Sequence, residues 1–115
     1  GLFMARLARL LCDQGHVVLV TKISPYAGLR RSIRRVIGRG KYVDVYVKCP
    51  LQVCMGRDWK GTYRKALAGE SKQVTGVGDR YDEPTNPFIV LRTDKETPDA
   101  LAVRLERMLK WRFGI

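Results

Sequence analysis

The short run Val17–Val20 is the feature that most constrains the fold, because it is apolar throughout and rich in valine. A run of this kind is typical of a strand that is covered on both faces, as the strands of parallel sheets are. Pro25 follows it and cannot donate to a ladder of backbone hydrogen bonds, so we expect a loop over residues 23–26. The run therefore predicts one strand of a buried parallel sheet.

Helical and strand patterns alternate along the rest of the chain. Apolar residues at helical spacing predict helices; Gly15 and Gly38 are placed to end two of them, and Thr97 with Pro98 is placed to begin the last. The expected elements are helices over 2–14, 27–37, 51–57, 61–68 and from 97 onward, and strands over 17–20, 42–49 and 88–92. This alternation predicts right-handed βαβ crossovers and an α/β fold with a parallel sheet.

Ligands of such sheets bind beyond the carboxyl ends of the strands. The expected site is therefore built by the loops after Val20 and Cys49 and by the polar stretch before Phe88, with Ser24 and Lys60 on one rim. Only three strands are visible, so we expect the sheet to need further strands from a missing segment. The chain begins with glycine rather than methionine, which fits either a truncated sequence or a start at Met4.

The net charge of +11 over 115 residues indicates anionic partners: nucleotide phosphates and sulfate, nucleic acid or an acidic membrane. The length suits one domain, and no apolar run reaches the roughly 20 residues that span a bilayer. Residues 1–12 have two interpretations, a basic amphipathic membrane segment and a packed helix that leads into the first strand. We favour the packed helix.

The cysteines Cys12, Cys49 and Cys54 form no C-x-x-C pair, and His16 is the only histidine. This composition argues against a zinc site, and reduced thiols in the cytoplasm are the default expectation. We therefore predict no metal-ligating residues.

Ser24 also has two interpretations. Its hydroxyl can tie down the loop backbone before a proline, or it can contact an anionic ligand at the strand end. A nucleophilic serine needs an adjacent base, and His16 lies at the other end of the strand, so we expect a ligand contact. Arg30 is the arginine nearest this loop in the basic ridge of the next helix, and its planar fork suits a phosphate or sulfate.

The stretch from residue 60 to about 87 is rich in glycine and basic residues. It is either an exposed loop or a lid that closes over phosphates and brings positive charge to the transferring group. Its length favours the lid. The lid residues that we single out are Arg64, Lys65, Lys72, Thr75 and Gly76.

Several segments together resemble the adenylylsulfate kinase family. Residues 17–26 look like the family's strand and its I-S-P-[YF] loop, and residues 44–54 (DVYVKCPLQVC) look like the segment that contains P-L-x-[VI]-C. Residues 57–63 (RDWKGTY) resemble R-D-x-K-G-L-Y, and residues 68–76 (AGESKQVTG) resemble A-G-E-I-K-x-F-T-G. The resemblance runs from about Leu2 to the C-terminus, and the motifs are specific in combination.

The resemblance implies a three-layer α/β/α fold of the P-loop nucleotide kinase type, with its N-terminal portion missing and residues 1–115 forming one partial domain. It implies ATP-dependent phosphorylation of the 3′-hydroxyl of adenylylsulfate to 3′-phosphoadenylylsulfate in sulfate assimilation, with Mg²⁺ entering together with ATP.

The site residues that the resemblance implies form two sets, one that binds adenylylsulfate and one on the ATP side. With Arg30 added from the analysis above, the substrate-binding set is Ile23, Ser24, Arg30, Lys60, Gln73 and Val74. The ATP-side residues are Glu96 and Leu101. Ser24 stands at a position often labelled a phosphoserine intermediate, although direct in-line transfer to the 3′-hydroxyl is physically simpler.

The chain departs from the family pattern in two ways that bear on activity. Val74 stands where the family has phenylalanine, so an aromatic surface for the adenine is lost. No G-x-x-x-x-G-K-[ST] loop occurs in the sequence, and the family's phosphate loop would lie upstream of Gly1. We therefore expect this chain alone to be inactive in phosphate transfer.

Two other functions remain open. One is a kinase-like module that binds adenylylsulfate or 3′-phosphoadenylylsulfate without catalysis and regulates a partner. The other is a basic nucleic-acid-binding domain, against which we note that the basic residues do not interleave with stacking aromatics. The expected partners are adenylylsulfate and ATP, a second copy in a homodimer, and a fused or associated ATP sulfurylase, with no membrane.

Overall fold

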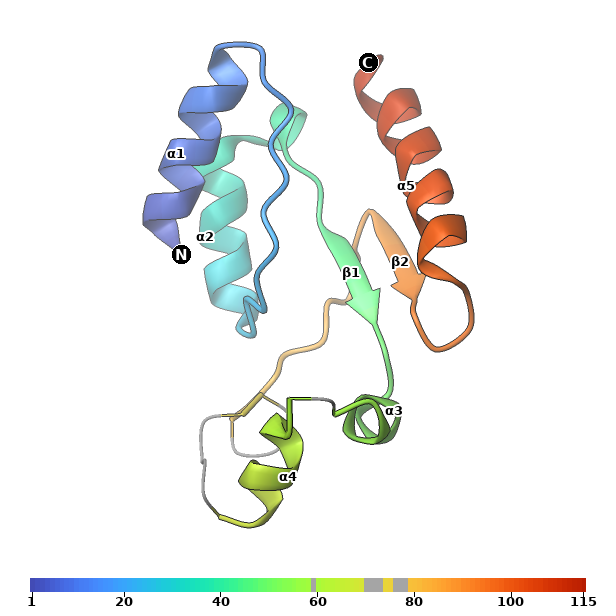
Figure 1. Ribbon diagram of the computed structural model, residues 1–115. Coiled ribbons are helices and arrows are strands. Elements are labelled where there is room, and N and C mark those ends of the chain that lie inside the picture. Colours follow the sequence, from blue (N-terminus) through green and yellow to red (C-terminus); the bar gives the residue numbers. More distant parts are fainter. Residues whose placement is uncertain (59, 70–73, 76–78) are drawn as a thin grey trace.

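A computed structural model describes residues 1–58, 60–69, 74–75 and 79–115. The elements within these ranges are α1 (Leu2–Asp13), α2 (Ala27–Ile37), the 3₁₀ turn η1 (Arg39–Lys41), β1 (Val45–Lys48), α3 (Leu51–Gly56), α4 (Thr62–Leu67), β2 (Ile89–Arg92) and α5 (Pro98–Phe113). Figure 1 shows them in three groups: α1 beside α2, the two strands beside α5, and α3 with α4 beyond the end of β1.

β1 and β2 form a parallel pair, in which Val45 lies opposite Ile89 and Lys48 lies opposite Arg92. Because parallel neighbours need a crossover connection, the chain leaves β1, forms α3 and α4, and returns to begin β2. The predicted α/β fold with a parallel sheet is confirmed, and both strands lie inside their predicted ranges.

The predicted strand over 17–20 is wrong, because the described residues form no strand there. Val17, Leu19 and Val20 have exposed fractions of 64, 76 and 47%. In Figure 1 this segment is an irregular connection between α1 and α2. A strand exists only through backbone bonds to a neighbour, and neither strand of the described sheet pairs with this run.

α1 packs against α2, which confirms the packed-helix interpretation of the first dozen residues. Ala5 and Ala8 of α1 and Ile37 of α2 are buried, and the short alanine side chains allow the helices to approach closely. Gly15 and Gly38 follow the two helices with φ of +91° and +96°, a region that glycine enters without steric cost. Within the described residues, no helix combines the length and the apolarity that crossing a bilayer requires.

α5 begins where the sequence predicts. The Thr97 hydroxyl oxygen accepts a hydrogen bond from the Ala100 backbone N–H at 3.3 Å, and Pro98 is the first helical residue. Leu101 of α5 and Leu91 of β2 are both buried, with exposed fractions of 5 and 7%. α5 lies beside the strand pair (Figure 1), and each of these two elements contributes one buried leucine.

Candidate functional site

The loop over 23–26 is held in an uncommon backbone conformation. Ser24 has a φ of +42°, and it is the one residue other than glycine with a positive φ in the part of the chain that the structure describes. For a residue with a Cβ atom this conformation costs on the order of 1–3 kcal/mol, so surrounding contacts must hold it.

Those contacts come from α2 and from residue 82. The Arg30 guanidinium donates to the Ser24 carbonyl at 2.7 Å through Nη1 and to the Asp82 carbonyl at 2.5 Å through Nη2. The Asp82 backbone N–H donates to the Pro25 carbonyl at 2.8 Å. We call the arrangement of Ser24, Arg30 and Asp82 the loop clasp.

The Asp82 side chain adds a further contact to the clasp. Its Oδ2 accepts from the backbone N–H of Ala27, the first residue of α2, at 3.0 Å. Its Oδ1 lies 3.1 Å from the Arg80 guanidinium, which also lies 5.0 Å from the centre of the Tyr26 ring. Residues 80–82 thus pack against the loop over 23–26 and the first residue of α2.

A second set of contacts joins this region to β1. The Tyr46 hydroxyl donates to Glu83 Oε1 at 2.9 Å, and the Tyr46 and Tyr81 rings lie 6.4 Å apart. Lys48 Nζ lies 4.0 Å from the same Glu83 oxygen. Burial, followed by the hydrogen bond to Glu83, raises the pKa of Tyr46 well above its ordinary range, so the phenol keeps its proton. Because Lys48 is the last residue of β1, the loop clasp lies toward the carboxyl end of that strand.

The expected lid begins at a capped helix. The Asp58 carboxylate accepts from the backbone N–H of Tyr63 at 3.1 Å and from that of Arg64 at 2.8 Å, which satisfies donors that the start of α4 leaves unpaired. Desolvation raises the pKa of Asp58, but these backbone bonds outweigh it and hold the pKa below the ordinary 3.8. Lys60 is exposed between α3 and α4, next to Gly61, whose φ is +71°.

Of the remaining lid and substrate-binding residues that the sequence predicts, four lie within the described ranges. Arg64 and Lys65 lie in the last turn of α4, and Val74 and Thr75 are half-buried, with the Asp79 N–H donating to the Val74 carbonyl at 3.1 Å. Three predicted residues lie outside the described ranges: Lys72, Gln73 and Gly76.

The two predicted ATP-side residues lie at the start of α5 and not in the loop clasp. Glu96 pairs with Arg104 at 3.3 Å, and the Leu101 side chain of α5 is buried. Leu101 therefore has a clear packing role, whatever contact a ligand makes nearby.

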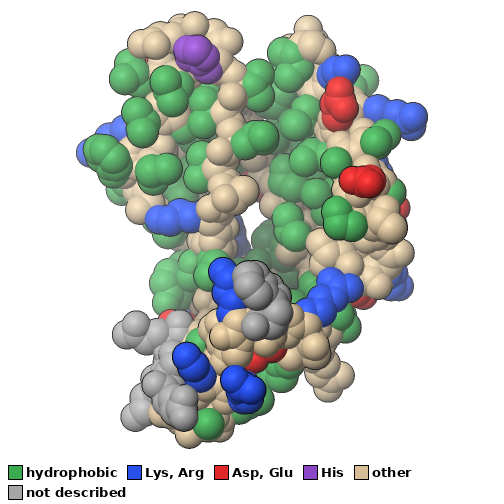
Figure 2. Space-filling view, in the orientation of Figure 1, with side chains coloured by type: hydrophobic (Ala, Val, Ile, Leu, Met, Phe, Trp, Pro, Cys, Tyr) green, Lys and Arg blue, Asp and Glu red, His purple; other side chains and the backbone are tan. Residues whose placement is uncertain are grey.

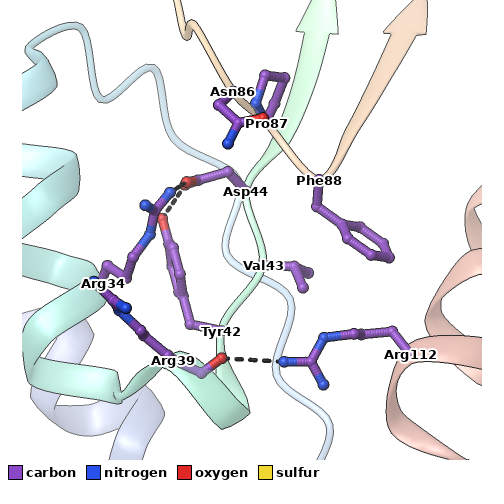
Figure 3. A pocket seen from close by; sticks show the side chains of 9 residues that line it. All are labelled: Arg34, Arg39, Tyr42, Val43, Asp44, Asn86, Pro87, Phe88 and Arg112. Atoms are coloured by element: carbon purple, nitrogen blue, oxygen red, sulfur yellow. Dashed lines mark hydrogen bonds and ion pairs between the residues drawn. The ribbon is translucent and has the colours of Figure 1, made fainter.

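A hollow of about 310 Å³ lies at the opposite end of the strands, before β1 and β2 begin (Figure 3). Its lining residues are Arg34, Arg39, Tyr42, Val43, Asp44, Asn86, Pro87, Phe88 and Arg112. Asp44 accepts from both Arg34 and the Tyr42 hydroxyl, and burial together with that bond raises the pKa of Tyr42. None of the predicted site residues that the structure describes lines this hollow, so those residues and the hollow are separate.

Positive charge gathers at the other end of the molecule. Figure 2 shows Lys and Arg side chains clustered over the α3–α4 group. A second, open hollow of about 410 Å³ lies there, lined by Met55, Gly56, Arg57, Asp58 and Arg64. The basic lid residues and the loop clasp are therefore both at the side of the sheet where β1 ends.

The sequence patterns did not single out Asp58 and Asp82, whose carboxylates accept hydrogen bonds at the start of α4 and in the loop clasp. Asp58 and Asp82 each accept backbone N–H bonds at the start of a helix, but each lies outside the helix that it caps. Asp58 stands four residues before α4, and that spacing is a local signal that could have been used. Asp82 is 55 residues from its partner Ala27, so no local pattern indicates it.

Comparison with known proteins covers nearly the whole chain. The family described as adenylylsulphate kinase matches residues 2–92. An adenylyl-sulfate kinase of Rippkaea orientalis (strain PCC 8801 / RF-1) is 46% identical over 103 residues, which make up 90% of this chain and 56% of that protein. The bifunctional enzyme NodQ of Rhizobium sp. (strain BR816) is 42% identical over 106 residues, which make up 92% of this chain and 17% of that protein.

A solved structure agrees with these relatives. The Mycobacterium tuberculosis APS kinase CysC, in complex with AMPPNP and APS, matches with a TM-score of 0.83 and 37% identity over 92% of this chain and 62% of that one. The expected fold of the P-loop nucleotide kinase type is thereby confirmed, while this chain spans only about half the length of the R. orientalis kinase. With a family match over residues 2–92 and relatives aligned along nine-tenths of its length, the chain belongs to the adenylylsulphate kinase family.

Proposed function

We propose that this chain is the adenylylsulfate-binding part of an adenylylsulfate kinase, which transfers the γ-phosphoryl group of ATP to the 3′-hydroxyl of adenylylsulfate in sulfate assimilation. The observation that carries the proposal is the loop clasp beside the basic α3–α4 group. It occurs in a chain that is 37% identical to a kinase whose structure contains APS.

In this proposal the loop clasp presents the substrate contacts. Ile23 is exposed and Ser24 is half-buried, so the loop has surface available to a ligand. Arg30 uses two of its five N–H donors on carbonyls, and a guanidinium with donors left over can also meet an oxyanion. Lys60, Gln73 and Val74 would complete the adenylylsulfate contacts.

The basic lid supplies charge for the transferring group. Arg64 and Lys65 on α4, with Lys72, Thr75 and Gly76 beyond it, would close over the phosphates and exclude water. In a transfer of this kind, catalysis is mostly positioning and stabilisation of negative charge, which suits cationic side chains on a closing segment. We assign Ser24 a contact role rather than a covalent one, because within the described ranges no hydrogen bond joins its hydroxyl to a base.

Mg²⁺ would enter with ATP as part of that substrate. Among the described residues no group of three His, Cys, Asp or Glu side chains could hold a metal ion, so no step is assigned to a metal site of this chain. Glu96 and Leu101 are proposed to lie on the ATP side. We also propose that this chain alone is inactive, that the protein is cytoplasmic, that it can dimerise, and that it works fused to or beside an ATP sulfurylase.

A second candidate function is a non-catalytic module that binds adenylylsulfate or 3′-phosphoadenylylsulfate. Val74 in place of the family's phenylalanine favours it. The two candidates share the ligand and differ in turnover.

Calorimetric titration of the purified chain with adenylylsulfate, and with 3′-phosphoadenylylsulfate, tests the shared part. Arg30→Ala should weaken binding about tenfold or more, as expected for loss of a charged hydrogen-bonding group. Arg35→Ala is the matched control, because Arg35 is an exposed arginine of the same helix. Equal affinities of the two variants would contradict the proposed role of the loop clasp.

Turnover separates the candidates. We expect the chain with Mg·ATP and adenylylsulfate to give no 3′-phosphoadenylylsulfate by chromatography, and measurable product would show the expectation of inactivity to be wrong. Failure to bind either nucleotide, together with tight salt-dependent binding of DNA or RNA, would replace both candidates by the nucleic-acid alternative.

A further inference from the structure

Two of the three cysteines meet at the start of α3. Pro50 is the N-cap residue of this helix, with φ −55° and ψ 140°, so Cys49 immediately precedes the cap and Cys54 is the fourth helical residue. Side chains at these two positions pack against each other at many helix starts, where both are usually hydrophobic. Here both are thiols, and Cys54 Sγ lies 3.8 Å from the Cys49 carbonyl oxygen.

The two thiols also interact with each other and with neighbouring side chains. Burial and a hydrogen bond to the Cys49 side chain raise the pKa of Cys54. Cys49 Sγ lies 4.0 Å from Nη1 of Arg57, whose Nη2 donates to the Thr93 carbonyl at 3.1 Å. The pair thus lies where the end of β1 meets α3.

Both thiols are half-buried, so a small reagent can reach them. Cys12 is equally half-buried, but it lies on α1, far along the chain from the other two. It therefore serves as an internal reference for ordinary thiol reactivity.

We propose that Cys49 and Cys54 form a dithiol modification site that a low-molecular-weight disulfide, such as oxidised glutathione, converts to an intramolecular disulfide. This inference does not depend on the proposed function. The resulting bond would link Cys49, which directly follows β1, to Cys54 in the second turn of α3, at the connection that leads to α4.

The reaction proceeds by two exchanges. The Cys49 thiol, whose sulfur lies 4.0 Å from Nη1 of Arg57, loses its proton and attacks one sulfur of oxidised glutathione; the glutathione S–S bond breaks and one glutathione thiolate leaves. Cys54 then loses its proton and attacks the Cys49 sulfur, forming the protein disulfide and releasing the second glutathione thiolate. The two protein sulfurs lose two electrons, the glutathione disulfide gains them, and the two protons pass to the released thiolates.

The test is equilibration of the purified chain with oxidised and reduced glutathione, followed by acid quenching, alkylation and trypsin digestion. Cleavage after Lys48 and Arg57 releases residues 49–57 as one peptide that contains both cysteines and excludes Cys12. We expect this peptide to lose the mass of two hydrogen atoms and to resist alkylation. Cys12→Ser should behave in the same way, whereas Cys49→Ser and Cys54→Ser should each gain one glutathione or remain a free thiol.

Equilibration in concentrated guanidinium chloride measures what the folded geometry contributes. We expect the internal disulfide to form at least about tenfold more favourably in the folded chain than in the denatured one. Two alkylated thiols in the folded peptide, or glutathione adducts without the internal bond, would overturn the proposal. Equal equilibrium constants in the two states would also overturn it, because the contact at the start of α3 would then have no effect.

Discussion

The Asp82 carboxylate gives the sharpest test of how the loop clasp is held together. Asp82→Ala removes the acceptor of the Ala27 N–H, at 3.0 Å, and the ion pair with Arg80, at 3.1 Å. A hydrogen bond to a charged group contributes about 1.5–3 kcal/mol, and the attraction between a carboxylate and a helix N-terminus adds about 0.3–1 kcal/mol. The Asp82 side chain is 31% exposed, which reduces both contributions, so we expect a loss of about 1.5–2.5 kcal/mol in the free energy of unfolding.

Two further variants separate the contributions. Asp82→Asn keeps an acceptor oxygen and removes the charge, so its loss should be about half that of Asp82→Ala. Arg80→Ala removes only an exposed ion pair, because the Arg80 side chain is 72% exposed, and it should cost about 0.5 kcal/mol or less. The reasoning is refuted if Asp82→Ala is no more destabilising than Arg80→Ala in urea unfolding followed by circular dichroism. Unchanged hydrogen exchange of the Ala27 amide in Asp82→Ala would refute it as well.

Three other perturbations test the core, the lid and the ligand contact. Leu101→Ala should lower the free energy of unfolding by about 2–4 kcal/mol, because the Leu101 side chain is buried. Val103→Ala, on the exposed side of α5, should change it little. Equal urea midpoints for the two variants would contradict the buried position of Leu101. For Asp58, backbone bonds hold the folded pKa below 3.8, so its stabilisation of α4 is fully present above the unfolded pKa and is lost as the pH falls through the lower folded value. The protection factor of the Arg64 amide in hydrogen exchange should therefore fall at acidic pH in the wild type, and it should already be low and independent of this titration in Asp58→Asn. Arg30→Lys should weaken adenylylsulfate binding in calorimetry, since an ammonium cannot span the Ser24 and Asp82 carbonyls as the guanidinium does. The circular dichroism spectrum should not change. An unchanged affinity would show that binding does not depend on the fork geometry of Arg30.

The elements that could be predicted are those whose signals act over a few residues. Thr97 and Pro98 start α5 through contacts within one turn, and Gly38 ends α2 through its own φ angle. Val17–Val20 has an equally clear pattern, but it is not a strand in the described residues. The difference is physical, because capping and turns are complete within the local sequence, whereas a strand needs backbone groups supplied by another segment.

The loop clasp likewise combines a residue that the sequence singles out with partners that local sequence does not indicate. A guanidinium can donate to an oxyanion and also to a carbonyl, so the sequence predicts that Arg30 is a donor but not which partners it has, one of which is 52 residues away at Asp82. Two bonds to carbonyls fix the Arg30 side chain before any ligand arrives. A ligand that recruits the remaining donors would meet an arginine whose rotamer entropy is already lost, and it would bind more tightly for that reason. The contacts that hold the strained Ser24 backbone and those that would meet the anion therefore depend on the same side chain, so the order of the loop and its affinity should change together.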